Sequence, residues 1–132
     1  MIRTIWPWAL LLVGACAVYP ARQAVDPRII GSVSAEAAAQ VRKCYRAPRV
    51  PSASRFISTR LLVRYGRDGS LSGLPVVLSQ GGLTPANRPW ADKMAQAATL
   101  AVIRCSPVRL PLSLYEQGWN ELELTFSPPA RA

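Results

Sequence analysis

Three cysteines, at positions 16, 44 and 105, are the residues of this chain best suited to covalent or metal chemistry. Their spacing fits none of the ligand patterns of structural zinc sites. The chain contains no histidine, which excludes His-based catalytic triads, Cys-His dyads and His-ligated metal sites. We therefore expect neither a metal nor another cofactor, and we expect the cysteines to serve attachment or structure.

Cys16 follows a leader of the signal-peptide type. Arg3 precedes an apolar run that reaches Tyr19, shorter than the roughly 20 residues that a membrane-spanning helix needs. The segment Val13–Cys16 resembles the lipobox of bacterial lipoproteins, and in such signals a cysteine not followed by aspartate is associated with the outer membrane. We expect residues 1–15 to be a signal peptide, Cys16 to be lipidated and residues 16–31 to be a linker. The alternatives are ordinary cleavage after Ala17 and an uncleaved anchor.

The other two cysteines then form an even pair in an exported, oxidising compartment. We expect a disulfide between Cys44 and Cys105. In the chain-entropy model such a crosslink over a loop of about 60 residues stabilises the fold by about 4 kcal/mol. The alternative is two buried free thiols.

Two acidic residues and two aromatic residues near the C-terminus form further candidate sites. Glu121 and Glu123 are a pair of carboxylates on one strand face, but strand alternation already explains both as solvent-facing. A glycosidase or peptidoglycan hydrolase is therefore a less favoured alternative. Tyr115 and Trp119, four residues apart, would form either an aromatic binding platform or a staple for the segment that contains them.

The formal net charge of +9 favours acidic partners. Arg60 and Arg64 share one face of a predicted strand. They lie in a region, residues 42–67, that contains no acidic residue. Its basic residues are Arg42, Lys43, Arg46, Arg49, Arg55, Arg60, Arg64 and Arg67. We expect this face to meet an acidic protein segment or anionic lipid, and we predict partner contacts at Arg60, Arg64, Arg67, Tyr115 and Trp119. Export and sparse aromatic residues argue against nucleic acid.

Periodicity predicts two helices in the part of the chain after the leader. Residues 90–105 place Trp90, Met94, Ala97, Ala98, Ala101 and Cys105 on one side of a 3.6-residue repeat. Asp92 near the start and Pro107 beyond the end fit the boundaries of this helix. A shorter helix from about Ala35 to Cys44 is expected, with Ser34 as its N-cap.

Alternation predicts three strands, over residues 56–65, 71–78 and 121–126. A Gly-rich turn at residues 66–69 joins the first two strands, and Pro75 marks the second as an edge or bulged strand. Residues 79–82 are expected to open a loop. The order α-β-β-α-β predicts an α+β fold in which a three-stranded antiparallel sheet packs on two helices.

The order and spacing of these segments resemble the TolA/TonB carboxy-terminal periplasmic domain in its small α-β form. The resemblance covers roughly residues 41–128. It rests on Val41–Tyr45, Leu61–Leu71, Pro75–Val77, Ala97–Cys105, Pro107–Pro111, Tyr115, Trp119 and Leu122–Pro128. We accordingly expect a TolA-like domain over residues 32–128 and a tail over residues 129–132.

The resemblance implies a non-enzymatic adaptor that binds periplasmic or outer-membrane proteins of the Tol-Pal type, and no small-molecule substrate. The full-length family member has an inner-membrane helix and a long stalk that this sequence lacks. We therefore expect a stand-alone lipoprotein in the periplasm, anchored to the outer membrane; a soluble periplasmic or inner-membrane-anchored form is the alternative. An exposed sheet edge, either the strand that contains Pro75 or the strand over Leu122–Phe126, would receive a partner strand. The alternative is that the linker covers that edge. The alternative function is a surface module that binds anionic lipid.

Overall fold

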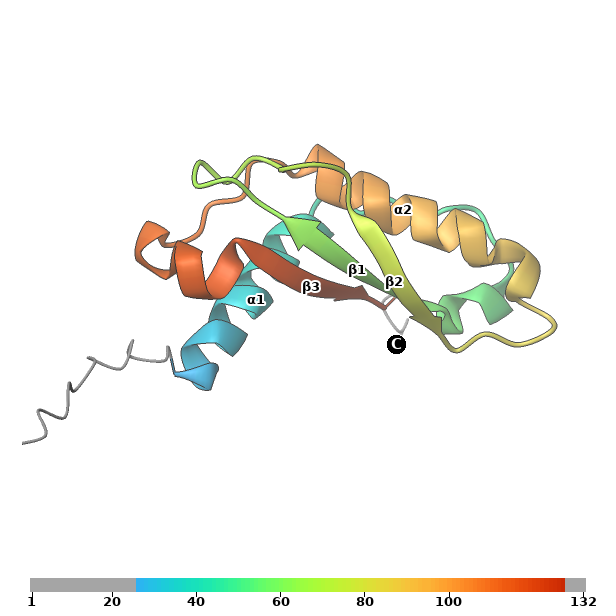
Figure 1. The fold of residues 1–132 in the computed structure, drawn as a ribbon. Coiled ribbons are helices and arrows are strands. Elements are labelled where there is room, and N and C mark those ends of the chain that lie inside the picture. The colour runs from blue at the N-terminus through green and yellow to red at the C-terminus, as the bar shows by residue number, and fades with distance from the viewer. Residues whose placement is uncertain (1–25, 128–132) are drawn as a thin grey trace, which may run out of the picture.

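The computed structural model describes residues 26–127, which fold into two helices and a three-stranded sheet (Figure 1). The elements are α1 (Pro27–Arg42), β1 (Ser58–Arg64), β2 (Val76–Gly81), α2 (Ala91–Arg104) and β3 (Glu121–Phe126). Short helical turns cover Ser52–Phe56, Arg88–Trp90, Leu112–Leu114 and Tyr115–Trp119. No helix within the described range has the length and apolar character needed to cross a bilayer.

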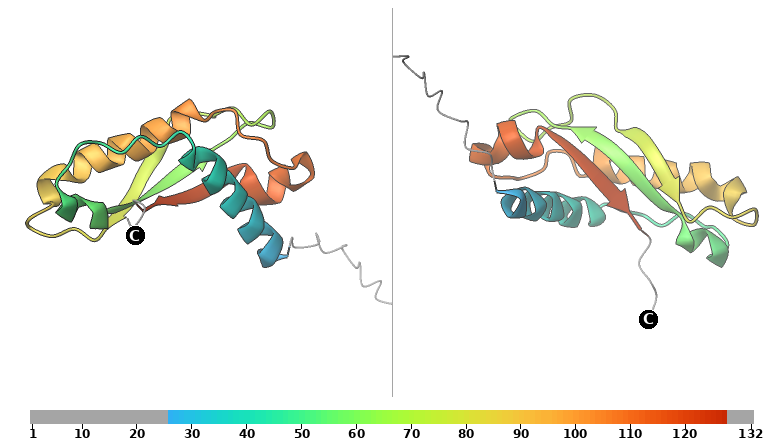
Figure 2. Two further views of the ribbon diagram at one scale, coloured as in Figure 1. Left: turned by 180° about the vertical axis from the view of Figure 1, so that it is seen from behind. Right: turned by 60° about the horizontal axis from the view of Figure 1, so that its bottom comes forward.

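The sheet is antiparallel, with strand order β2-β1-β3, and both helices cover the same face of it (Figure 2). The central strand β1 buries every second side chain, so that Leu61 lies opposite Leu124 and Val63 opposite Leu122 of β3. These four side chains face the helices because strand residues two apart share a face. The predicted α+β architecture and element order are confirmed.

The core is formed between the helices and the covered face of the sheet. α2 contributes Met94, Ala98 and Ala101 from its predicted face, together with Val102, and these residues are buried. α1 buries Val33, Ala37 and Val41, which recur every four residues along one side. The small alanine side chains let the helices approach the sheet closely. The larger side chains that fill the core therefore come mainly from the sheet and from Trp119.

A disulfide between Cys44 and Cys105 joins the chain just after α1 to the C-terminal end of α2. The two Cα atoms lie 5.7 Å apart, and the positions of the two cysteines in the sequence differ by 61. The predicted pairing is confirmed. By constraining the unfolded chain, a crosslink over this separation stabilises the fold by about 4 kcal/mol in the chain-entropy model.

The first helix begins at Pro27 instead of near Ala35, so residues 27–31 are helical and the prediction of a linker through residue 31 is wrong there. Asp26 is the N-cap residue, and its side chain accepts a hydrogen bond of 2.9 Å from the Arg28 backbone N–H. Pro27 suits the first helical position because its fixed φ matches the helix. Ser34, the expected N-cap, lies inside the helix.

The return strand β2 also differs from its prediction. Tyr65 forms an isolated bridge with Leu71, and the Ser72 N–H donates to the Arg64 carbonyl at 2.8 Å. The chain then leaves the ladder and passes Pro75, whose nitrogen cannot donate, and β2 starts only at Val76. The predicted strand over residues 71–78 is thus interrupted before Pro75.

At its other end β2 continues through Gly81, so the expectation of a loop from residue 79 is wrong. The Gln80 side-chain amide donates to Thr59 Oγ1 at 3.2 Å and to the Ala91 carbonyl at 2.8 Å. These contacts hold the strand against both β1 and α2. The register with β1 shifts between Arg60 and Leu61, opposite Leu78. The predicted edge position of this strand is confirmed, and its bulge lies at Leu78, three residues after Pro75.

The turn between β1 and β2 is held against the segment that follows α2. Gly69, with φ of 83°, donates its N–H to the Gly66 carbonyl at 2.9 Å. Its own carbonyl accepts from the N–H of the buried Val108 at 2.9 Å. A Cβ at this position would collide with the Val108 carbonyl, so both the positive φ and the close approach require glycine. The predicted turn is confirmed, and the segment after α2 packs onto it.

We predict opposite effects for two tyrosine hydroxyls in this region. Tyr65 is 1% exposed, and its hydroxyl has no hydrogen-bond partner among the described residues. The Tyr115 hydroxyl donates to the Tyr65 carbonyl at 2.7 Å. Tyr115→Phe should lower the free energy of unfolding by about 1 kcal/mol, whereas Tyr65→Phe should leave it unchanged or raise it at neutral pH. Urea unfolding followed by circular dichroism measures both.

Tyr65→Phe also tests how the free energy of unfolding depends on alkaline pH. Burial raises the pKa of Tyr65 to about 12, above its ordinary value of 10.0. Between these values the unfolded chain loses the proton while the folded chain keeps it, so stability should fall as pH rises above about 10. Tyr65→Phe lacks this ionisable group, so its free energy of unfolding should fall less between neutral pH and about pH 11 than that of wild type. The difference between the two losses should exceed about 1 kcal/mol. An equal decline in the variant would contradict the assignment.

Candidate partner-binding surfaces

The solvent face of the sheet carries Arg60 and Arg64, as predicted, but their charges are matched by acidic residues on β3. Arg64 Nε lies 3.0 Å from Glu121 Oε2, and Arg60 Nη1 lies 3.7 Å from Glu123 Oε2. The β1–β3 register brings these side chains together, since Arg64 lies directly opposite Glu121. The neighbouring strand therefore offsets the charge of this face, and contact of Arg60 and Arg64 with an acidic partner stays a prediction.

Arg67 and Tyr115 meet at one end of the sheet. Arg67 Nη1 forms an ion pair of 2.8 Å with Glu116 Oε1, and its guanidinium lies 5.5 Å from the centre of the Tyr115 ring. Arg67 and Glu116 are exposed, so the ion pair contributes little to stability. The structure thus brings Arg67 and Tyr115 into one surface cluster, apart from Arg60 and Arg64.

Trp119 is a core residue and is not available as a binding platform. It is 1% exposed, and its indole N–H donates to the Pro111 carbonyl at 2.6 Å. The Tyr115 ring packs edge-on against it, with ring centroids 4.7 Å apart. Of the two predicted roles for this aromatic pair, the staple is the one that the packing supports, and partner binding by Trp119 is contradicted by its burial.

The outer edge of β2 exposes large apolar side chains. Leu74 is 80% exposed, and Val76, Val77 and Leu78 are 54%, 42% and 39% exposed. No charged residue occurs between Asp68 and Arg88, so β2 itself carries no charged side chain that would repel a second strand. Proteins usually protect such edges with charged residues, and here only the irregularity before Pro75 and the bulge interrupt the strand.

The opposite edge, formed by β3, has the usual protection. Its exposed positions are occupied by Glu121, Glu123 and Thr125, and its apolar residues Leu122 and Leu124 are buried. Two charged side chains therefore stand beside the backbone that an incoming strand would have to approach. Of the two edges that the sequence left open, β2 is the one that offers apolar contacts.

The C-terminal end of β2 is anchored by Asn87, which lies just before the helical turn Arg88–Trp90. Asn87 is 1% exposed. Its side-chain N–H groups donate to the carbonyls of Ala53 at 3.1 Å and Gly82 at 2.9 Å, and its Oδ1 accepts from the Thr84 N–H at 2.7 Å. Because the Ala53 carbonyl lies 34 residues away in the sequence, no local pattern indicated that Asn87 joins these two segments.

The described residues contain no arrangement that points to catalysis or metal binding. No group of three or more Cys, Asp or Glu side chains is placed to hold a metal ion within residues 26–127. Glu121 and Glu123 form separate, exposed ion pairs with Arg64 and Arg60. The predicted lipidation site, Cys16, lies outside the described residues.

No protein-family model and no curated protein sequence matches this chain. Among solved structures the chain is similar to the solution structure of TolAIII bound to a peptide derived from the N-terminus of TolB. The TM-score is 0.54 at 19% sequence identity, and the alignment covers 82% of each chain. The chain has a TolA-like fold. At this identity the likeness concerns the fold, and it agrees with the resemblance that the order of sequence segments indicated.

We predict that Asn87 determines how firmly the end of β2 is held. Asn87→Ala would leave the Ala53 and Gly82 carbonyls and the Thr84 N–H without their partners, and should lower the free energy of unfolding by roughly 3 kcal/mol. Asn120→Ala, which removes an exposed hydrogen bond to the Glu121 N–H, should cost less than about 1 kcal/mol. Urea unfolding compares them, and hydrogen exchange should show the loss of protection at residues 79–82. Equal stability of the two variants would refute the role of Asn87.

Proposed function

We propose that this protein is a non-enzymatic binding domain of the cell envelope that receives an extended segment of a partner protein at the outer edge of β2. The observation that carries the proposal is the exposure of Leu74, just before β2, and of Val76, Val77 and Leu78 in β2, an edge strand that itself carries no charged residue. An added strand would pair with the free backbone groups of β2 and cover these apolar side chains.

The energetics favour this use of the edge. A partner strand would remove three or four large apolar side chains from water, and each contributes on the order of 1 kcal/mol when half-exposed surface becomes buried. β2 is already held on its other side by β1, and at its end by Gln80 and Asn87, so little ordering of the receiving strand is required. A pre-ordered edge loses less conformational entropy on binding.

The similar solved structure supports a protein partner, since TolAIII is bound there to a peptide from the N-terminus of TolB. We extend this to a Tol-type partner, TolB, Pal or an outer-membrane protein, in the periplasm. The Arg67–Tyr115 cluster lies outside β2 and could add polar contacts with such a partner. Arg60 and Arg64 form ion pairs with glutamates of β3, so they would bind a partner only if the partner's carboxylates replaced those glutamates.

Attachment to the membrane is a separate part of the proposal. It rests on the lipobox-like Val13–Cys16, with Cys16 carrying the lipid and residues 1–15 removed. Since Cys44 and Cys105 are bonded to each other, Cys16 has no intramolecular cysteine left to pair with. That pairing agrees with the use of Cys16 for attachment.

We predict that a lysine at the β2 edge weakens strand addition and that a lysine at the β3 edge does not. Val76→Lys and Thr125→Lys are a matched pair, because each position is exposed on the solvent face of an edge strand. Binding of the TolB N-terminal peptide should fall roughly fivefold in Val76→Lys and stay within about twofold of wild type in Thr125→Lys. A titration followed by NMR amide shifts gives both the affinity and the edge used.

Perturbed amides should cluster along residues 74–81. Shifts concentrated on β3, or an equal loss in Thr125→Lys, would overturn the assignment of β2. Absence of binding to this peptide and to Pal would refute the Tol-type partner. Both variants should keep the wild-type unfolding midpoint, because neither side chain belongs to the core.

We predict that the mature protein extracted from membranes has a mass that begins at Cys16 plus lipid, and that the mass rises by about two hydrogens when its single disulfide is reduced. Intact mass spectrometry before and after reduction is the measurement. A lipid-free chain beginning at Val18 would make the protein a soluble periplasmic form. A chain beginning at Met1 would indicate an uncleaved anchor, and either result would refute lipidation at Cys16.

A further inference from the structure

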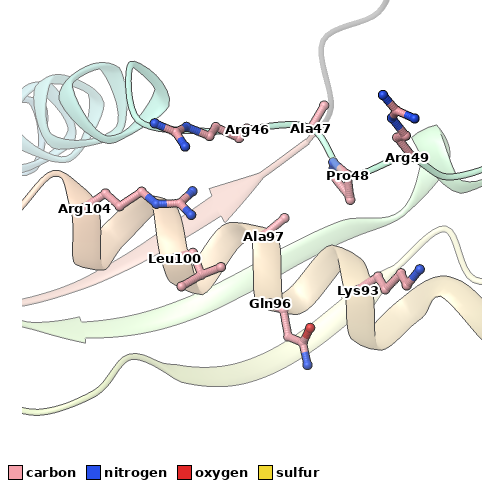
Figure 3. A pocket seen from close by; sticks show the side chains of 9 residues that line it. All are labelled: Arg46, Ala47, Pro48, Arg49, Lys93, Gln96, Ala97, Leu100 and Arg104. Carbon is pink, nitrogen blue, oxygen red and sulfur yellow. The ribbon is translucent and has the colours of Figure 1, made fainter.

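A groove of about 410 Å³ runs between α2 and the segment that connects α1 to β1. Figure 3 shows Arg46 and Arg104 toward one end of the groove and Arg49 and Lys93 toward the other. Pro48, Ala97 and Leu100 give it an apolar lining between these charges. The groove belongs to the helical layer, with the sheet behind α2 in this view, so it is separate from the edge of β2.

The four cations of the groove have no acidic counterpart. The three ion pairs of residues 26–127 all involve other arginines, namely Arg60, Arg64 and Arg67. No Asp or Glu lines the groove. Asp92 adjoins Lys93 in α2 but is not among the lining residues. Four of the cations that form no ion pair among the described residues are therefore gathered at one concave surface, and a concavity lined by one sign of charge concentrates the opposite sign.

The spacing of the cations fits an extended ligand better than a single anion. Lys93 and Arg104 are eleven residues apart on one helix, which places them roughly 16 Å apart along its axis at 1.5 Å per residue. An extended peptide of about five residues spans this length at 3.3 Å per residue. Lys93 is held by the Trp90 ring, with its Nζ 5.1 Å from the ring centre. Carboxylates at both ends of such a peptide would meet both pairs of cations.

The acidic residues must come from another molecule. Residues 1–25 and 128–132 contain no Asp or Glu, so the segments of this chain outside the described structure cannot supply side-chain carboxylates. A membrane surface is a poorer fit, because the apolar residues line the concavity between the charges and do not form a protruding face. Arginine forks pair with carboxylates through two parallel hydrogen bonds, which a peptide can present in a defined geometry.

We propose that the groove lined by Arg46, Arg49, Lys93 and Arg104 binds an extended acidic segment of a partner protein, at a site separate from the β2 edge. The carboxylates lie over the cations at the two ends, and small or apolar side chains of the segment lie on Pro48, Ala97 and Leu100. Because this surface and the β2 edge use different residues, a partner can engage one without the other, and the proposal does not depend on strand addition.

The test uses a fluorescein-labelled peptide, Glu-Glu-Ala-Ala-Glu-Glu, with its lysine counterpart as the charge control. The purified protein with its disulfide intact is titrated by fluorescence anisotropy. The variant Arg46→Gln/Arg104→Gln removes two groove charges, and Arg28→Gln/Arg55→Gln removes two exposed charges elsewhere, so both carry the same net charge. We expect the groove variant to bind the acidic peptide roughly fivefold more weakly than the control variant, and binding to weaken with added salt.

Amide shifts should map to residues 46–49 and 93–104. An equal loss in the two double variants would show non-specific charge attraction and overturn the proposal, as would absence of peptide binding. Groove-dependent binding to phosphatidylglycerol vesicles without peptide binding would assign the site to lipid and overturn it. Self-association that is lost in the groove variant would assign it to a second copy, with the same consequence. All four substituted arginines are exposed, and equal unfolding midpoints check that both variants fold.

Discussion

The burial of one face of β1 is the constraint on which the rest of the structure depends. Ile57, Thr59, Leu61, Val63 and Tyr65 are each at most 1% exposed, and they alternate along the central strand. Such a strand cannot be stable alone, since its apolar face must be covered and its backbone groups must be paired on both sides. β2 and β3 supply the pairing, and the two helices supply the cover. The disulfide links the helix ends and so holds the two covering elements together.

The opposite face of the sheet follows from the same alternation. Once the apolar side chains of β1 and β3 turn toward the helices, Arg60, Arg64, Glu121 and Glu123 must turn toward water, and the antiparallel register sets opposite charges side by side. This neutralises the centre of the sheet. Among the described cations that form no ion pair, Arg46, Arg49, Lys93 and Arg104 line a groove in the helical layer.

The molecule therefore presents two chemically different surfaces to its surroundings. One is the apolar, uncharged edge of β2, whose position is maintained by Gln80 and by the buried Asn87. The other is the basic groove of the helical layer. Strand pairing depends mainly on backbone hydrogen bonds and apolar contact, which salt affects little, whereas the groove depends on charge, which salt screens. Ionic strength thus distinguishes a partner that uses one surface from a partner that uses the other.

The sequence by itself determined the features that follow from a repeating pattern of apolar residues or from the number of cysteines. Alternation specified β1 and β3, the 3.6-residue repeat specified α2, and counting cysteines specified the bond between Cys44 and Cys105. Tertiary structure decided the rest, because each remaining feature depends on residues far apart in the chain. The register of β2 depends on contacts with β1 and α2, the neutralisation of Arg64 depends on Glu121 of another strand, and the burial of Trp119 depends on how its segment packs. No local pattern records such pairings, since their free energy appears only when the distant segments meet.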